Sequence, residues 1–235
     1  MPPVLLAVAH GSRDPAALTS IRALLRGVRA LRPELTVRCC FLDLARPTLA
    51  EALARLAYAR PVLVPLLLGT GHHLRVDLPA ALAAAGLPPD RLAPALGPHP
   101  LLAEALAHRL GEAGAPPDAP VVLAGAGSTD PAALAGTART ADLLAARLGR
   151  PVTPAHLSAA APTPRQAVAG LLAAGHPRVA LASYLLSPGH FARRAATTTA
   201  ATWTGAPLAT HPAVARLVLH RYDRARAATE PAAAA

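Results

Sequence analysis

Short apolar runs alternate with longer stretches whose apolar positions recur at helical spacing, and this alternation continues through most of the chain. A short apolar run that ends at glycine is typical of a buried parallel strand. The first half predicts strands at 4–9, 35–41, 62–68 and 92–96 and helices at 14–31, 47–58, 75–85 and 99–110. The second half predicts strands at 121–124, 152–157, 179–186 and 207–210 and helices at 130–148, 162–174, 191–202 and 212–226. Strand–helix alternation predicts parallel α/β sheets with right-handed crossovers.

The two halves also share sequence motifs. Three motifs recur at offsets of 115 to 118 residues: 11–18 at 127–134, 45–48 at 160–163, and 67–72 at 185–190. This recurrence predicts an internal duplication, so we expect two Rossmann-like α/β domains, each with a parallel sheet. Glycine and proline mark 111–120 as a linker, which gives expected domains of 1–114 and 115–228. The Ala-rich segment 229–235 is expected to be disordered.

Polar side chains capable of chemistry follow the first three predicted strands. His10 comes directly after the first strand, Asp43 after the second, and the adjacent His72 and His73 after the third. The carboxyl ends of parallel strands meet at one edge of a sheet, where open α/β folds place their sites. Strands one and three are neighbours in the common doubly wound order, so we expect His10 and His73 to converge.

The second half of the repeat keeps the scaffold motifs but not these candidate groups. It has Ala126 for His10, Ser158 for Asp43 and Phe191 for His73, and retains a histidine only at the position of His72. This favours a site confined to the first domain, with the second domain closing the cleft over it. Neutral imidazole suits divalent Fe, Co, Ni and Zn, and a carboxylate adds charge balance. His10, His73 and Asp43 would therefore hold a metal with coordination positions left open.

Composition narrows the class of ligand. The net charge is +10, and all 23 basic residues are arginine, which together with abundant Ala and Pro indicates a codon bias. A basic surface also suits a polycarboxylate ligand. Basic clusters interleaved with aromatic residues, zinc-finger spacings and RNP-like motifs are lacking, so we expect no nucleic-acid partner.

The chain shows none of the patterns typical of membrane or secreted proteins. No apolar run approaches the roughly 18 residues of a membrane span, so we expect no membrane partner. We see no signal-peptide pattern at the N-terminus. Cys39 and Cys40 are adjacent in a strand, point to opposite faces and are poor disulfide partners. These features favour a reduced, cytoplasmic setting.

Three motifs occur in order along the first half: Ala-His-Gly-Ser-Arg at 9–13, Phe-Leu-Asp-Leu with Pro-Thr within 41–48, and the segment 65–79 that contains His73. Together they resemble the sirohydrochlorin chelatases, which are class II chelatases of cobaltochelatase and ferrochelatase type. The second half is similar to the degenerate repeat of the long, two-domain members. The resemblance implies an ATP-independent lyase that inserts Fe²⁺ or Co²⁺ into sirohydrochlorin with release of two protons, for siroheme or cobalamin biosynthesis. It implies no cofactor beyond this substrate metal.

The resemblance also assigns roles to residues. It implies that His10 and His73 bind the metal, whereas the family often carries Glu where this chain has Asp43, and often has a small residue at the position of His72. We expect Arg13 and Arg75, near the motifs, to contact the carboxylates of the tetrapyrrole. His10, His73 or Asp43 would accept the pyrrole protons. Since metal binding needs neutral imidazole, activity is expected to fall below about pH 6.

Other functions remain open at the level of sequence. A tetrapyrrole or metal carrier would use the same site without turnover. A histidine-phosphatase-type enzyme would need an arginine directly before His10, where this chain has Ala9. A structural α/β protein without a site would not explain why His10 and His73 are lost from the second copy. The sequence does not distinguish Fe²⁺ from Co²⁺ as the metal, nor a monomer from a homodimer.

Overall fold

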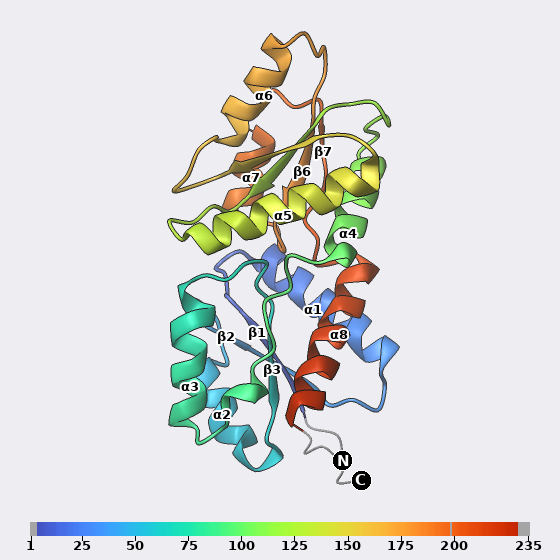
Figure 1. Ribbon diagram of the computed structural model, residues 1–235. Helices are drawn as coiled ribbons and strands as arrows, with labels where there is room; N and C mark the ends of the chain where they lie inside the picture. The colour runs from blue at the N-terminus through green and yellow to red at the C-terminus, as the bar shows by residue number, and fades with distance from the viewer. Residues whose placement is uncertain (1–3, 198, 230–235) are drawn as a thin grey trace. The chain divides into compact units, whose positions relative to one another are not determined.

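The computed structural model describes residues 4–197 and 199–229 and contains two parallel sheets with helices around them (Figure 1). The chain folds into two compact units. Unit 1 runs to Leu96 and takes in the described residues from Ala215 onward, and unit 2 is Gly97–Val214. All but the first residue of the expected disordered tail, 229–235, lies outside the described residues.

The sheet of unit 1 has the strand order β2-β1-β3, with every pairing parallel. Its strands are β1 (Leu5–Ala9), β2 (Val37–Phe41) and β3 (Val62–Pro65). Each residue of β1 and β3 is buried, which explains why these segments read as continuous apolar runs. The sheet confirms that strands one and three are neighbours, and it brings all three strand ends to one edge.

The sheet of unit 2 repeats this order with one strand added, β5-β4-β6-β7, again with parallel pairing throughout. Its strands are β4 (Val121–Gly125), β5 (Val152–His156), β6 (Ala180–Tyr184) and β7 (Trp203–Thr204). The expected fold of two parallel-sheet α/β domains is therefore confirmed.

Eight α-helices are present in the described part of the chain. They are α1 (Pro15–Leu31), α2 (Leu49–Leu56), α3 (Leu78–Ala84), α4 (Pro100–Glu112), α5 (Pro131–Leu148), α6 (Pro164–Ala173), α7 (His190–Thr197) and α8 (Pro212–Thr229). Single 3₁₀ turns occur at Ala57–Ala59 and Pro89–Arg91, and a π-helical turn, η2, spans His73–Asp77 directly before α3.

Local hydrogen bonds explain why several elements begin at equivalent places in the two halves. Asp14 and Asp130 accept the amide hydrogens of Ala16 and Ala132, at 2.9 and 3.0 Å, and so cap α1 and α5. The helices α2 and α6 share another start signal: the Glu51 and Gln166 side chains accept from the amides of Thr48 and Thr163. These bonds explain why the motifs recur in both halves, because the motifs stabilise the starts of scaffold helices.

Two expected strands are corrected by the structure. The strand expected at 92–96 is reduced to a single bridge between Leu63 and Leu92, because Pro65 at the end of β3 has no amide hydrogen to donate to the Ala93 carbonyl and continue the ladder. In unit 2 the fourth strand is β7 at Trp203–Thr204 rather than 207–210, which contains Pro207. The helix expected at 191–202 is also shorter, since α7 ends at Thr197.

The compact units do not coincide with the expected domains 1–114 and 115–228. The last helix of the first half, α4, belongs to unit 2, and most of α8, from the second half, belongs to unit 1. Helix α8 lies beside α1 (Figure 1), where both carboxylate oxygens of Asp223 accept from Arg32 at 2.7 and 2.8 Å. The Arg221 guanidinium also donates to the Leu96 carbonyl at 2.9 Å.

These exchanged helices carry a fourth repeated motif, which was not among the three expected from the sequence. His-Pro at 99–100 followed by His-Arg at 108–109 recurs at 211–212 and 220–221, an offset of 112 residues. His99 Nδ1 accepts the Leu101 amide hydrogen at 3.1 Å, and His211 Nδ1 accepts that of Ala213 at 3.2 Å. The histidine caps the helix in both copies, so this motif is scaffold.

Two buried histidines of unit 2 predict a pH-dependent stability. Burial lowers the pKa of both His156 and His211, and each side chain is only 6% exposed. Both rings are therefore neutral in the folded protein at pH values where the unfolded chain already binds protons, so the stabilisation is full above about pH 6.5 and is lost as the pH falls. We expect the free energy of unfolding, measured by urea denaturation, to decrease between pH 7.5 and pH 5.

A matched variant separates His156 from the other titrating groups. The first copy has Phe41 at the position of His156, so His156→Phe should fold and should show a smaller decrease over this pH range. An unchanged pH dependence in that variant would contradict a contribution from His156.

Both cysteines are free, as expected from their adjacent positions in β2. Burial raises the pKa of the Cys39 thiol to about 11 and that of Cys40 to about 12. Both thiols are consequently protonated at neutral pH and unreactive.

Candidate metal site

The first element of the site is the tight turn that carries His10. Directly after β1, Gly11 adopts a φ of +98°, and a Cβ at that position would lie 1.7 Å from the Asp43 carbonyl oxygen. The Asp43 amide in turn donates to the His10 carbonyl at 2.9 Å. The loops after β1 and β2 are thus fastened to each other, and only glycine permits this approach.

The same turn exists in unit 2 without the histidine. Gly127 has a φ of +91°, and a Cβ there would lie 1.9 Å from the Ser158 carbonyl oxygen. Position 126, which corresponds to His10, is alanine. The turn is therefore a property of the fold, and the imidazole at its start is an addition specific to the first copy.

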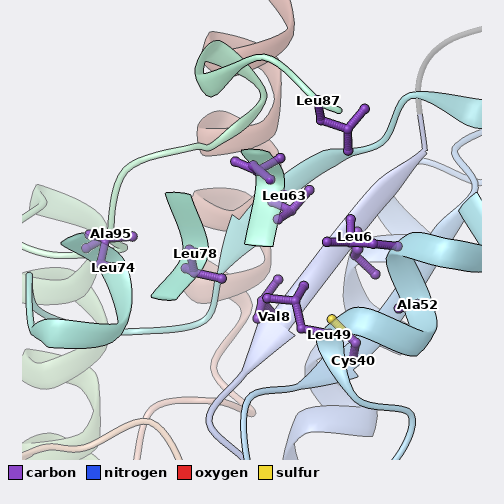
Figure 2. Packing of buried hydrophobic residues seen from close by; sticks show 12 residues of the cluster. Leu6, Val8, Cys40, Leu49, Ala52, Leu63, Leu74, Leu78, Leu87 and Ala95 are labelled. Atoms are coloured by element: carbon purple, nitrogen blue, oxygen red, sulfur yellow. The ribbon is translucent and has the colours of Figure 1, made fainter. Parts of the chain in front are cut away.

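The second element of the site is the π-helical turn η2. Chain segment 66–71 leaves β3 and leads into His72 and then His73, which begins η2. Leu74 in η2 and Leu78 at the start of α3 are buried in the core cluster of unit 1, where Figure 2 shows them with Leu6, Val8 and Leu63. These leucines anchor the turn, while the His73 side chain remains 39% exposed.

The structure brings His10 and His73 together. Their ring centroids lie 5.0 Å apart, with the ring planes at 78° to each other. Two imidazoles that bind one metal ion at nitrogen–metal distances near 2.0–2.1 Å place their ring centres about 5 Å apart. The two side chains therefore have the separation that a shared ion requires.

Only the backbone of Asp43 is held next to this pair, by the hydrogen bond from its amide to the His10 carbonyl. Its side chain is exposed, and Oδ1 accepts the amide hydrogen of Leu44 at 2.7 Å, within its own loop. In the described residues, no group of three or more His, Cys, Asp or Glu side chains is arranged to hold a metal ion. The imidazole pair is thus the part of the expected three-residue set that the structure assembles.

The two expected arginine contacts lie on the same two segments as the histidines. Arg13 follows His10 in the loop after β1, and Arg75 follows His73 within η2. Both side chains are exposed. Their guanidinium groups are accessible to an anionic ligand, and bidentate pairing with carboxylates is the geometry that arginine favours.

One polar residue at the site was not among those expected from the sequence. Asp77, the last residue of η2, places Oδ2 2.6 Å from His73 Nδ1 and Oδ1 3.7 Å from His72 Nε2. The signal was available in the sequence, because residues four apart on a helical turn face each other. A search for carboxylates four residues after each candidate histidine would have found this pair.

The fold and the imidazole pair together define the class of this protein. Its two parallel-sheet α/β units are of the class II chelatase type. SirB from Bacillus subtilis, solved with Fe³⁺, aligns over 97% of this chain and 96% of its own, at 24% identity and a TM-score of 0.78. The sirohydrochlorin chelatase SirB from B. subtilis subspecies spizizenii, in complex with cobalt, aligns over 97% of both chains, at 22% identity and a TM-score of 0.75.

A third solved structure and the family model complete the assignment. CbiX, described as the terminal enzyme for siroheme biosynthesis in denitrifying bacteria, aligns over 97% of this chain and all of its own, at 24% identity and a TM-score of 0.65. The chain belongs to the CbiX family, because the CbiX family model matches residues 4–113 and again residues 120–225. This double match agrees with the internal duplication. No curated protein sequence matches the chain.

Within residues 4–197 and 199–229, no helix is both long enough and apolar enough to cross a bilayer.

Proposed function

We propose that this protein is an ATP-independent sirohydrochlorin chelatase, which inserts Fe²⁺ or Co²⁺ into sirohydrochlorin with release of two protons. The observation that carries the proposal is the His10–His73 pair, whose rings lie 5.0 Å apart at the carboxyl edge of the sheet in unit 1. Membership of the CbiX family supports it, as does the similarity to SirB structures with Fe³⁺ and cobalt.

In this proposal His10 and His73 hold the substrate metal. Two neutral imidazoles suit both ions and leave most of the coordination sphere open for water or for the pyrrole nitrogens. A site with few protein ligands can release the metal to the macrocycle, which offers four nitrogens in a plane. No cofactor beyond the substrate metal is needed for the insertion.

The arginines and Asp43 have separate roles. Arg13 and Arg75 would pair with the carboxylates of sirohydrochlorin and hold the macrocycle over the imidazole pair. Insertion removes two pyrrole protons, and a base near the metal must accept them. The Asp43 backbone amide donates to the His10 carbonyl, and the Asp43 carboxylate is exposed. We propose that this carboxylate is the base, together with the imidazoles as they release the metal.

The free thiols support a proposal for the cellular setting. Cys39 and Cys40 are free, which suits a reduced compartment, and we propose the cytoplasm.

An anaerobic absorbance assay tests the proposed activity. Sirohydrochlorin is mixed with Fe²⁺ or Co²⁺, with and without the protein, and the spectral change on metal insertion is followed with time. We expect a rate well above that of the uncatalysed reaction, and the metal with the higher rate indicates the pathway. Binding of the tetrapyrrole without any rate increase would replace this proposal with a non-catalytic carrier.

A further inference from the structure

We propose that Asp77 is a positioning residue for His73: its carboxylate holds the Nδ1–H of the imidazole, so that Nε2 is the atom offered to the metal. This inference rests on the proposed metal site. It assigns to Asp77 the orientation of a ligand, and it places no contact between Asp77 and the metal.

The geometry of the pair supports this role. His73 Nδ1 lies 2.6 Å from Asp77 Oδ2, at the short end of the distances found for hydrogen bonds to a carboxylate. A carboxylate in this position accepts a hydrogen bond from Nδ1–H and thereby fixes both the tautomer and the rotation of the ring. Metal-binding histidines commonly use their second nitrogen in this way, which also makes the first nitrogen a better ligand.

Asp77 serves no evident purpose in holding its own segment. It stands at the N-terminus of α3, where aspartate commonly caps a helix, but its backbone is already helical at φ −68° and ψ −43° and its side chain makes no capping hydrogen bond. Its other carboxylate oxygen lies 3.7 Å from Nε2 of His72, whose side chain is 74% exposed. An exposed pair at that distance contributes little to stability.

The duplication supplies an independent observation. At the offset of 118 residues that relates these segments, His73 corresponds to Phe191 and Asp77 to Ala195, whereas His72 and Arg75 retain their residue types as His190 and Arg193. The corresponding segment of unit 2 still forms a helix, α7, in which Ala195 is fully buried. The fold therefore does not require the imidazole–carboxylate pair, and its two members are absent together from the copy that lacks the site.

Cobalt binding to the full chain tests the inference directly. Co²⁺ is titrated into the wild type, Asp77→Asn and Asp77→Ala, and binding is followed by the visible absorption of the Co²⁺ ion. We expect the dissociation constant to rise about 10- to 100-fold in Asp77→Ala, and less in Asp77→Asn, whose amide oxygen can still accept from Nδ1. In the insertion assay the KM for the metal should rise by a larger factor than kcat falls.

A matched control and the wild type make the result decisive. Asp90→Asn removes another exposed carboxylate of unit 1, in the 3₁₀ turn Pro89–Arg91, and should bind Co²⁺ as the wild type does. Wild-type affinity in both Asp77 variants would overturn the positioning role while leaving the metal site intact. If His73→Ala binds Co²⁺ as tightly as the wild type, the proposed site itself is wrong. Should Asp77→Ala fail to fold, the Co²⁺ affinity of Asp77→Asn, which preserves the side-chain shape, tests the positioning role.

Discussion

His10→Ala and His73→Ala are each expected to lower the rate of metal insertion by at least about 100-fold, since replacing even an outer-shell partner of a metal ligand costs 10- to 100-fold. Each variant removes half of an imidazole pair whose ring centres are 5.0 Å apart. A single remaining imidazole would bind the metal weakly, and the deficit should appear mainly in the KM for the metal. The rate is measured by anaerobic absorbance with sirohydrochlorin and Co²⁺.

The matched control for this prediction is His72→Ala. It removes the imidazole directly before His73, and its side chain is 74% exposed. We expect it to insert metal at a rate close to that of the wild type. A loss in His72→Ala equal to that in His73→Ala would contradict the assignment of the ligand to His73.

Gly11→Ala is expected to reduce both stability and metal binding strongly. A non-glycine residue at a φ of +98° is strained by about 1–3 kcal/mol, and the new Cβ would lie 1.7 Å from the Asp43 carbonyl oxygen. The loops after β1 and β2 must separate to admit it, which would displace His10. We expect a free energy of unfolding at least about 2 kcal/mol below that of the wild type and a Co²⁺ affinity near that of His10→Ala.

Two further glycine variants separate strain from displacement of the site. Gly86 has a φ of +66° but open space around it, so Gly86→Ala should cost only the backbone strain, about 1–2 kcal/mol. Gly127→Ala introduces the same clash as Gly11→Ala, in unit 2, against the Ser158 carbonyl oxygen. It should lower stability to a similar extent while the folded protein keeps its Co²⁺ affinity. A Gly11→Ala protein as stable as the wild type would show that the turn is not as tight as described.

The sequence predicted the parts of the fold that depend on local patterning. The apolar runs of β1 and β3, followed by glycine-containing turns, predicted the parallel sheet, and the common doubly wound order predicted that these two strands are neighbours. The convergence of His10 and His73 followed from that order, because it needs only the rule that parallel strands share a carboxyl edge. The internal repeat added a comparison that separated scaffold glycines from candidate ligands.

The exchange of helices could not be predicted from the sequence. Helix α4 is the last helix of the first half of the repeat along the chain but belongs to unit 2, and α8 contacts the end of α1 through the Arg32–Asp223 pair, which spans 191 residues. Amphipathic spacing shows that a helix buries one face, without showing which sheet or helix covers that face. Pro65 is a different case, since its missing amide hydrogen was visible in the sequence and shortens the expected fourth strand to one bridge.

The site was predicted only in part, because the strand pattern does not show where every side chain points. His73 was recognised because it stands near the end of a strand and is lost from the copy. Asp77 is lost from the copy as well, but it lies one helical turn further on, within η2 rather than in the strand-end loop. The side-chain direction of Asp43, toward the Leu44 amide, depends on a local turn that no sequence pattern specifies.

The most direct test of the metal site is the position of bound cobalt, located by anomalous diffraction from crystals of the full chain grown with Co²⁺. We expect a single strong peak about 2.0–2.3 Å from a ring nitrogen of both His10 and His73, with Nε2 as the nitrogen on His73. A peak bound at other residues, or the absence of a peak between these two imidazoles at saturating Co²⁺, would contradict the site on which the proposed function rests.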